Sequence, residues 1–265
     1  MTTALTPSSA LSVVVLAAGK GTRMRSDLPK VLQPLAGKPL LGHVLDTVHT
    51  LQAQTAVVVT GFGAQAVQDT FADHSGLRFA LQEPQLGTGH AVQQALPDLP
   101  QDGACLVLYG DVPLVPAASL LPLVADAQAG ALALLTVELD DPTGYGRILR
   151  AADGAVHGIV EHKDASSAQR AVRECNTGIL CAPLVHLRRW LSQLRNDNAQ
   201  GEYYLTDVVA LAVADGVPVR ASTVIDADDV LGVNDRRQLA HLERVLQTRA
   251  ADRLLDAGVT LPDPT

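Results

Sequence analysis

Short, largely apolar runs alternate with helical stretches through the first half of the chain. The runs lie at residues 13–17, 56–60, 77–81, 104–109 and 131–138, and helical patterns such as residues 40–51 separate them. A strand that is apolar at every position is buried on both faces, which is typical of parallel sheets covered by helices. The alternation therefore predicts an α/β fold with a mostly parallel sheet and helices on both faces. In such a sheet, ligands bind beyond the carboxyl ends of the strands.

The pattern changes after Asp140. Glycines now separate short alternating segments at residues 147–150 and 156–160, which predict antiparallel strands in a small subdomain. Helical patterns return at residues 184–195, 205–214 and 234–257. We expect the last of these helices to pack on the domain.

These patterns predict one domain rather than two, because no linker rich in proline or serine divides the chain. We place this domain at residues 13–257, with a first part at about 13–139, a second at about 140–233 and a C-terminal helix at about 234–257. Residues 1–12 and 258–265 are predicted to be tails.

Composition narrows the class of function. The formal net charge is −8 and aromatic residues make up 3% of the chain, which argues against nucleic acid and anionic membranes as partners. Three cysteines in no ligand spacing disfavour a disulfide framework or a zinc site. No apolar run approaches ~18 residues and the N-terminal segment lacks a basic region. We therefore expect a soluble, cytoplasmic protein.

The loop after the first strand combines small residues with clustered cations. Lys20, Arg23, Arg25 and Lys30 lie within eleven residues, although the whole chain has four lysines. Exposed backbone N–H groups and cations together favour a polyanion such as a triphosphate, whereas a Gly-x-Gly alone is more often a solvated turn. Met24 stands where a dinucleotide-binding loop needs its third glycine, and the spacing of a P-loop is absent.

Polar residues also follow the third and fourth strands. Asp111 comes directly after the fourth, where a carboxylate can hold Mg²⁺ against phosphates or, alternatively, cap the next helix. Gln82 follows the third, and its amide offers the donor and acceptor that a pyrimidine edge needs. Residues 61–66 fit G-x-G-x-x-A, which we interpret mainly as a tight turn. His90 and His162 are interpreted as structural or loop histidines.

The chain lacks the patterns of common catalytic nucleophiles and zinc hydrolases. There is no G-x-S-x-G, H-E-x-x-H or C-x-x-C. Phosphoryl-type transfer to a substrate phosphate needs no protein nucleophile, because the attacking oxygen is already ionised and positioning and electrostatics suffice.

Residues 16–24 with Leu28-Pro29-Lys30 resemble the signature loop of sugar-1-phosphate nucleotidyltransferases. Seven further segments resemble the uridyltransferase domain of the bacterial N-acetylglucosamine-1-phosphate uridyltransferases, at residues 85–90, 108–113, 141–147, 160–164, 174–178, 199–204 and 232–234. The resemblance runs from about Val13 to the C-terminus. It implies a Rossmann-like fold of the nucleotide-diphospho-sugar transferase type, with a nucleotide-binding first part and a sugar-binding second part.

The resemblance also implies a reaction and a set of site residues. UTP and N-acetylglucosamine 1-phosphate would give UDP-N-acetylglucosamine, a cell-wall precursor, and pyrophosphate, with Mg²⁺ as cofactor. The catalytic cations would be Arg23, Lys30 and Lys20. The nucleotide would contact Leu16, Ala17, Ala18, Gly19, Gln82, Gly87 and Thr88. The metal would be held by Asp111 and Asn234, and the sugar by Gly146, Glu161 and Asn176 with Tyr109 close by. Lys30 is expected to be exposed, so that its loss would leave stability almost unchanged.

The sequence departs from the family pattern in one respect. Many members carry a second half, a β-helix of hexapeptide repeats that acetylates glucosamine 1-phosphate and forms trimers, and no hexapeptide period is present here. We therefore expect a mainly monomeric chain without acetyltransferase activity. Three alternatives remain: a sibling nucleotidyltransferase for another base or sugar, a non-catalytic nucleotide-sugar sensor, and a nicotinamide oxidoreductase, which Met24 disfavours.

Overall fold

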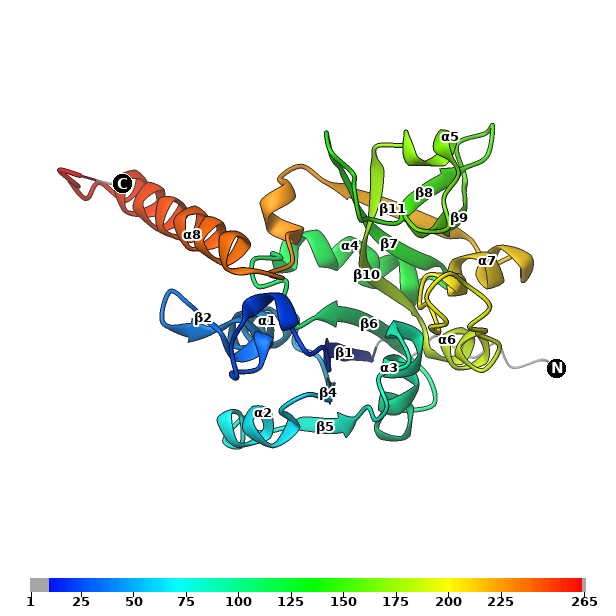
Figure 1. The fold of residues 1–265 in the computed structure, drawn as a ribbon, viewed down its shortest axis with the longest axis horizontal. Coiled ribbons are helices and arrows are strands. Elements are labelled where there is room, and N and C mark those ends of the chain that lie inside the picture. Colours follow the sequence, from blue (N-terminus) through cyan, green and yellow to red (C-terminus); the bar gives the residue numbers. More distant parts are fainter. Residues whose placement is uncertain (1–9, 264–265) are drawn as a thin grey trace.

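A nine-stranded sheet forms the centre of the molecule (Figure 1). The computed structural model describes residues 10–263, so residues 1–9 of the predicted N-terminal tail and 264–265 of the C-terminal tail lie outside the described part. The main path of the sheet has the order β11-β7-β10-β6-β1-β4-β5. Its strands are β1 (Leu11–Ala17), β4 (Thr55–Thr60), β5 (Leu77–Leu81), β6 (Ala104–Tyr109), β7 (Leu132–Glu138), β10 (Glu174–Pro183) and β11 (Val219–Val224).

The pairing is mostly parallel, as the continuous apolar runs predict. β1 is parallel to both β4 and β6, β4 is parallel to β5, and β11 is parallel to β7. All seven residues of β1 are buried. Val13 and Val15 of β1 belong to the core on one face of the sheet, and Val14 and Leu16 to the core on the other. The prediction of a sheet covered on both faces is therefore confirmed.

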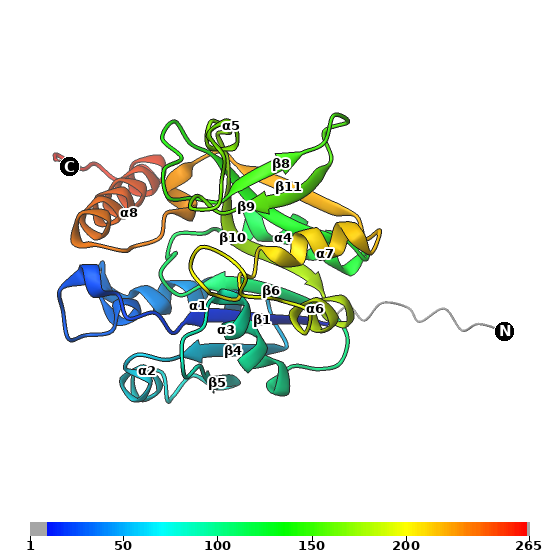
Figure 2. The same cartoon turned by 45° about the vertical axis from the view of Figure 1, so that its right-hand side comes forward.

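Helices cover both faces of this sheet (Figures 1 and 2). The first core includes residues of α1 (Leu40–Thr50), α2 (Ala64–Thr70) and α4 (Ala117–Gln128). The second includes residues of α3 (Thr88–Ala95), α6 (Leu184–Leu191) and α7 (Asp207–Ala214). α6 ends at Leu191, earlier than the predicted Arg195, and α7 begins two residues after the predicted Leu205.

β10 is the element that sequence patterns missed. It runs antiparallel between β6 and β7 and also pairs with β8 (Arg147–Arg150), which pairs in turn with β9 (Val156–Val160). The predicted antiparallel strands therefore exist, and they are added to the main sheet through β10. The short helix α5 (Ser167–Arg170) follows β9, and a small ribbon of β2 (Pro34–Leu35) and β3 (Lys38–Pro39) follows the first loop.

The last helix, α8 (Arg236–Asp256), leans away from the body of the molecule (Figure 1). Its buried residue Leu242 packs with Met24, Leu35, Leu40 and Val233 in a third cluster. Further along the helix, Leu254 and Leu255 are 46% and 42% exposed. Arg249 of α8 still pairs with Asp226 and Asp229 of the body, so the expectation that the helix packs on the domain is wrong only for its last residues, 252–256, which are exposed.

The composition led to expectations about the cysteines and about membrane-spanning segments, and the described residues bear on both. The three cysteines, Cys105, Cys175 and Cys181, are free and buried. No helix among residues 10–263 combines the length and the apolar character that a bilayer crossing requires.

Candidate active site

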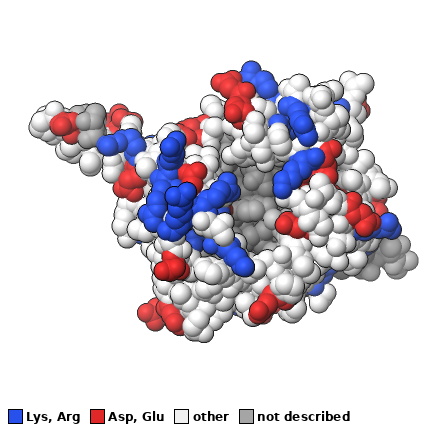
Figure 3. Space-filling model, in the orientation of Figure 1, with Lys and Arg blue, Asp and Glu red and all other residues white. Residues whose placement is uncertain are grey.

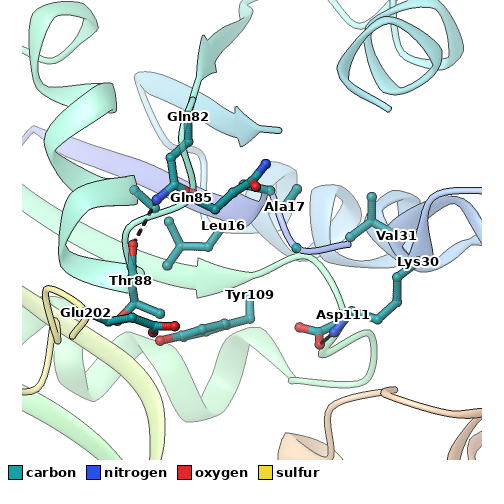
Figure 4. Close-up of a pocket in the computed structure, with 14 residues that line it drawn as sticks. Leu16, Ala17, Lys30, Val31, Gln82, Gln85, Thr88, Tyr109, Asp111 and Glu202 are labelled. Atoms are coloured by element: carbon teal, nitrogen blue, oxygen red, sulfur yellow. Dashed lines mark hydrogen bonds and ion pairs between the residues drawn. The ribbon is translucent and has the colours of Figure 1, made fainter. Parts of the chain in front are cut away.

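A cavity of about 250 Å³ opens at the carboxyl ends of β1, β5 and β6 (Figure 4). Chain connections leave β1 toward β4 on one side and return to β6 on the other, so this is the switch point where open α/β sheets bind ligands. The lining residues from strand ends and their loops are Leu16, Ala17, Ala18, Gly19, Gln82, Gln85, Gly87, Thr88, Tyr109 and Asp111. Lys30, Val31, Ala91 and Glu202 complete the lining.

Gln82 forms a fixed polar group on one wall of this cavity. It is 3% exposed, and its Nε2 donates to the carbonyl of Gly87 at 2.9 Å and contacts Nδ1 of His90 at 3.1 Å. Burial lowers the pKa of His90, which favours a neutral ring whose Nδ1 accepts. His90 thus orients the amide of Gln82, a structural role consistent with its interpretation from sequence. With Nε2 held in this way, Oε1 is the atom of Gln82 that can accept a hydrogen bond from a ligand.

The Gly87–Thr88 turn is held by a segment that follows much later in the chain, residues 199–204. The backbone of Tyr203 bonds to Leu86 and Gly89, both at 2.8 Å, and the hydroxyl of Thr88 accepts from the N–H of Leu205 at 3.1 Å. Gly87 has a φ of +111°, and a Cβ there would lie 2.7 Å from the carbonyl oxygen of Tyr203. Glycine is therefore required at this close approach.

Three polar side chains from distant segments meet at the other end of the cavity. Nζ of Lys30 forms an ion pair with Asp111 and donates to Oδ1 of Asn234 at 3.1 Å. The side chains of Lys30 and Asp111 are 13% and 14% exposed. The expectation of an exposed Lys30 is therefore wrong: the residue turns inward from the loop because a carboxylate and an amide oxygen stabilise its ammonium there.

Backbone geometry places the two oxygens beside each other. The N–H of Val233 donates to the carbonyl of Asp111 at 2.8 Å, which aligns the segment containing Asn234 with the end of β6.

The helix α4 begins only at Ala117, with Pro116 in the N-cap position and no side-chain cap. Asp111 is therefore not the helix cap that was the alternative interpretation.

The glycine-containing loop contributes backbone to the cavity and cations to its surroundings. Lys20 and Arg23 are exposed and do not line the cavity, unlike Lys30. Nε of Arg236, at the start of α8, donates to the carbonyl of Met24 at 3.0 Å and ties the loop to that helix. Lys and Arg side chains gather at the rim of the hollow seen in Figure 3. The loop therefore presents positive charge at the mouth of the cavity.

The residues predicted to bind sugar form a second cluster, beyond Tyr109. The N–H of Asn176 donates to the carbonyl of Gly146 at 2.9 Å, and a Cβ on Gly146 would lie 3.4 Å from both carboxylate oxygens of Glu161. The hydroxyl of Thr206 donates to Glu161 at 3.0 Å. Gly146, Glu161 and Asn176 are thus brought together from three separate segments.

Tyr109 lies between the residues predicted to bind sugar and Asp111. Burial raises its pKa, and the nearby carboxylates of Glu161 and Asp111 raise it further, so its hydroxyl stays protonated and can donate. A Cβ on Gly178 would lie 2.6 Å from the tyrosine ring, so the ring packs directly on the backbone of β10. Burial also raises the pKa of the Glu161 carboxyl, although the hydrogen bond from Thr206 lowers it in part.

Sequence reasoning missed five residues of this region. These are Val31, Gln85, Ala91 and Glu202, which line the cavity, and Thr206, which binds Glu161. Gln85 and Glu202 lie in segments that the motifs had singled out, so their polar side chains were the available signal. Nothing local in the sequence indicates that residues 199–206 fold back over residues 86–89.

The arrangement defines a class of protein: an α/β domain of the nucleotidyltransferase type, with a glycine-containing loop that carries Lys20 and Arg23 after β1 and a carboxylate after β6. The model of the MobA-like NTP transferase domain matches residues 13–257, and the chain therefore belongs to this family. Among curated proteins, it is 60% identical to the bifunctional protein GlmU of Alkalilimnicola ehrlichii over 96% of its length and to that of Paracidovorax citrulli over 97%. Its identity to the same protein of Thiobacillus denitrificans is 59% over 96%. The family resemblance predicted from the sequence is thus confirmed. The chain spans about half, 55%, of the length of each relative.

Proposed function

We propose that this chain transfers a uridylyl group from UTP to N-acetylglucosamine 1-phosphate and releases pyrophosphate. The observation that carries the proposal is that Lys30, Asp111 and Tyr109 line one cavity at the strand ends, and that Tyr109 also lies near Glu161 of the cluster with Gly146 and Asn176. A nucleotide and a sugar phosphate need two such subsites, with charged side chains where the reacting phosphates meet. The motifs that resemble sugar-1-phosphate nucleotidyltransferases and the high identity to the GlmU relatives support the same assignment.

In this proposal the two subsites orient the reacting groups. The backbone of Leu16 to Gly19 approaches the nucleotide, and Gln82 with the Gly87–Thr88 turn pairs with the base. Glu161 accepts from sugar hydroxyls, while Asn176 and Gly146 contact the acetamido side. An oxygen of the sugar phosphate attacks the α-phosphorus of UTP, a new P–O bond forms, and the bond to the bridging oxygen of pyrophosphate breaks. The attacking oxygen is already ionised, so the protein supplies position and charge.

The cations have a separate task in this proposal. Lys30, at the edge of the cavity, and Arg23 and Lys20, in the glycine-containing loop after β1, hold the phosphates and the charge that develops as pyrophosphate leaves. Positive charge that is fixed before the reaction stabilises the transition state without reorganisation.

Mg²⁺ fits the residues present. Asp111 and Asn234 already converge on one cation, the ammonium of Lys30, with a carboxylate and an amide oxygen. Mg²⁺ is commonly held by one or two carboxylates together with substrate phosphates and water. Among the described residues no group of three or more His, Cys, Asp or Glu side chains could hold a metal, so the phosphates would complete the coordination. When bound, the ion would neutralise charge on phosphate oxygens.

The test is pyrophosphate release with UTP and a panel of sugar 1-phosphates, with and without Mg²⁺. Release that requires UTP, N-acetylglucosamine 1-phosphate and the metal is the expected result. Release with another nucleotide or sugar would indicate a sibling nucleotidyltransferase. Binding of UDP-N-acetylglucosamine without any turnover would indicate a nucleotide-sugar sensor. The cytoplasmic location and monomeric state expected from the sequence remain predictions.

The base subsite should select uracil strongly. The kcat/KM for UTP is expected to exceed those for CTP, ATP and GTP by at least ~100-fold, because a buried site with unpaired polar groups rejects a mismatched partner. The Oε1 of Gln82 can accept from N3–H of uracil, whereas N3 of cytosine carries no hydrogen. dTTP is expected to be the nearest competitor. Equal use of UTP and GTP in initial-rate measurements would contradict the assignment.

The sugar subsite yields a second prediction. Glu161→Gln is expected to raise KM for N-acetylglucosamine 1-phosphate by ~10-fold or more, with KM for UTP unchanged, because the amide accepts more weakly than a carboxylate. Stability should not fall. The pKa of Glu161 is raised in the folded state, which means that the folded protein disfavours the ionised carboxylate. Ionisation therefore lowers the stability as pH rises above the unfolded pKa, and the stability returns as pH falls through the folded pKa. A lower Tm at pH 7 for the variant, or a raised KM for UTP alone, would contradict this prediction.

A further inference from the structure

The ammonium of Lys30 occupies the point where two oxygen ligands converge. It pairs with Asp111 and donates to Oδ1 of Asn234 at 3.1 Å, and Figure 4 shows the side chains of Lys30 and Asp111 pointing toward one another. Both contacts lie in a part-buried region, where each charge is weakly screened. Asp111 and Asn234 are also the two side chains to which the proposed function assigns the metal.

The inner carbons of Lys30 are held against the loop, whereas its ammonium is held only by Asp111 and Asn234. Gly21 has a φ of +59°, and a Cβ there would lie 2.6 Å from Cβ of Lys30, so the loop backbone packs directly against the base of the side chain. Beyond this contact, lysine has a flexible four-carbon chain that carries a compact charge. Lys30 also lines the cavity together with Gly19, on the side where the proposed function places the phosphates. Rotation of the outer carbons can therefore move Nζ from Asp111 toward that side.

We propose that Lys30 is a built-in competitor of the metal, and that a divalent cation binds Asp111 and Asn234 firmly only when Nζ has moved to the phosphates. A metal ion and an ammonium cannot share the same two oxygens, because Mg²⁺ approaches its ligands to ~2.0–2.1 Å and the two cations repel. The inference rests on the proposed function in one respect, since it takes Asp111 and Asn234 as the metal ligands.

The competition couples the metal to the nucleotide. Without a phosphate, displacement of Lys30 leaves its charge without the carboxylate partner, which weakens metal binding. A triphosphate offers Nζ a new partner, so each ligand favours the binding of the other. The device would keep the metal from binding firmly before the nucleotide that it serves.

A Mn²⁺ titration of the chelator-treated protein, without any nucleotide, tests this inference. The electron paramagnetic resonance signal of free Mn²⁺ reports how much of the metal is bound. Lys30→Met is expected to lower the Kd for Mn²⁺ by at least ~10-fold relative to the unmodified chain. In the variant the metal no longer has to break the charge-assisted hydrogen bond between Lys30 and Asp111, whose free energy corresponds to a factor of that size. Methionine fills the part-buried space of the lysine stem and offers no oxygen to the metal.

Two further variants make the result specific. Arg25→Met removes one positive charge from the same loop, where Arg25 is exposed, and its Kd should stay within ~3-fold of the unmodified value. Adding Asp111→Asn to Lys30→Met should abolish the gain. No gain in Lys30→Met, an equal gain in Arg25→Met, or a gain that survives Asp111→Asn would each overturn the inference. Pyrophosphate release by the unmodified chain with no gain in Lys30→Met would overturn the inference alone, whereas a specific gain without any release would overturn the proposed function alone.

Discussion

Asp111→Asn is expected to lower kcat for pyrophosphate release by at least ~100-fold, which corresponds to roughly 2.7 kcal/mol of transition-state stabilisation. The substitution keeps the shape of the side chain and removes the charge that faces Lys30 and that the proposed function assigns to Mg²⁺. Initial rates at saturating UTP and sugar phosphate, measured over a range of Mg²⁺ concentrations, check the prediction.

A matched control separates the site from the general effect of a lost charge. Asp46 also pairs with a lysine, Lys38, but its side chain is 66% exposed. Asp46→Asn should therefore leave kcat unchanged, because exposed ion pairs contribute little. Near-normal turnover of Asp111→Asn, or full activity of the unmodified chain in excess chelator, would show that the carboxylate does not hold a catalytic metal.

Lys30→Ala is expected to lower kcat/KM by two or more orders of magnitude, ~3 kcal/mol or more, because the positive charge that stabilises the leaving pyrophosphate is lost. The inward position of Lys30 adds a consequence for stability. Its loss leaves Asp111, whose side chain is 14% exposed, without its ion-pair partner, so we expect a loss of about 1–3 kcal/mol in the free energy of unfolding. Steady-state kinetics and denaturant unfolding measure the two effects.

The same pair of measurements on Lys38→Ala provides the comparison. Lys38 is 39% exposed beside Asp46, and its loss should change neither kinetics nor stability by a measurable amount. If Lys30→Ala kept its kinetics while its Tm fell strongly, the residue would serve the fold rather than the reaction.

Local patterns predicted the strands of the first part of the chain, residues 13–139, well. The strands at Leu77–Leu81 and Ala104–Tyr109 begin and end where the apolar runs do. At Ala104–Tyr109 burial on both faces requires apolar side chains at nearly every position, whereas Leu77–Leu81 is an edge strand in which only Ala80 is buried. Once the strands are placed, the residues that follow them lie at one edge of the sheet. The positions of Gln82 and Asp111 beside the cavity followed from that rule alone.

The second half depends on contacts that no local pattern records. The first residues of β10, Glu174-Cys175-Asn176-Thr177-Gly178, are largely polar and include a register shift after Asn176, so they lack the pattern of a buried strand. The inward turn of Lys30 depends on partners that lie 81 and 204 residues away. A sequence shows which residues carry charge, but the direction in which a long side chain points is decided by such distant neighbours.

The continuity of β10 has a consequence for the choice of substrates. Asn176 lies among the residues proposed to bind the sugar, whereas Leu180 to Pro183 of the same strand pair with β6, which ends at Tyr109. β10 thus connects the central sheet to the residues proposed to bind the sugar, and these parts can move apart only by breaking the pairs of β10 with β6 or β7 or by bending at the register shift between Asn176 and Leu180. In the proposed function this limits the separation between base and sugar to a narrow range. A sugar phosphate of the wrong length should fail because it cannot reach both ends at once, whatever the strength of its individual contacts.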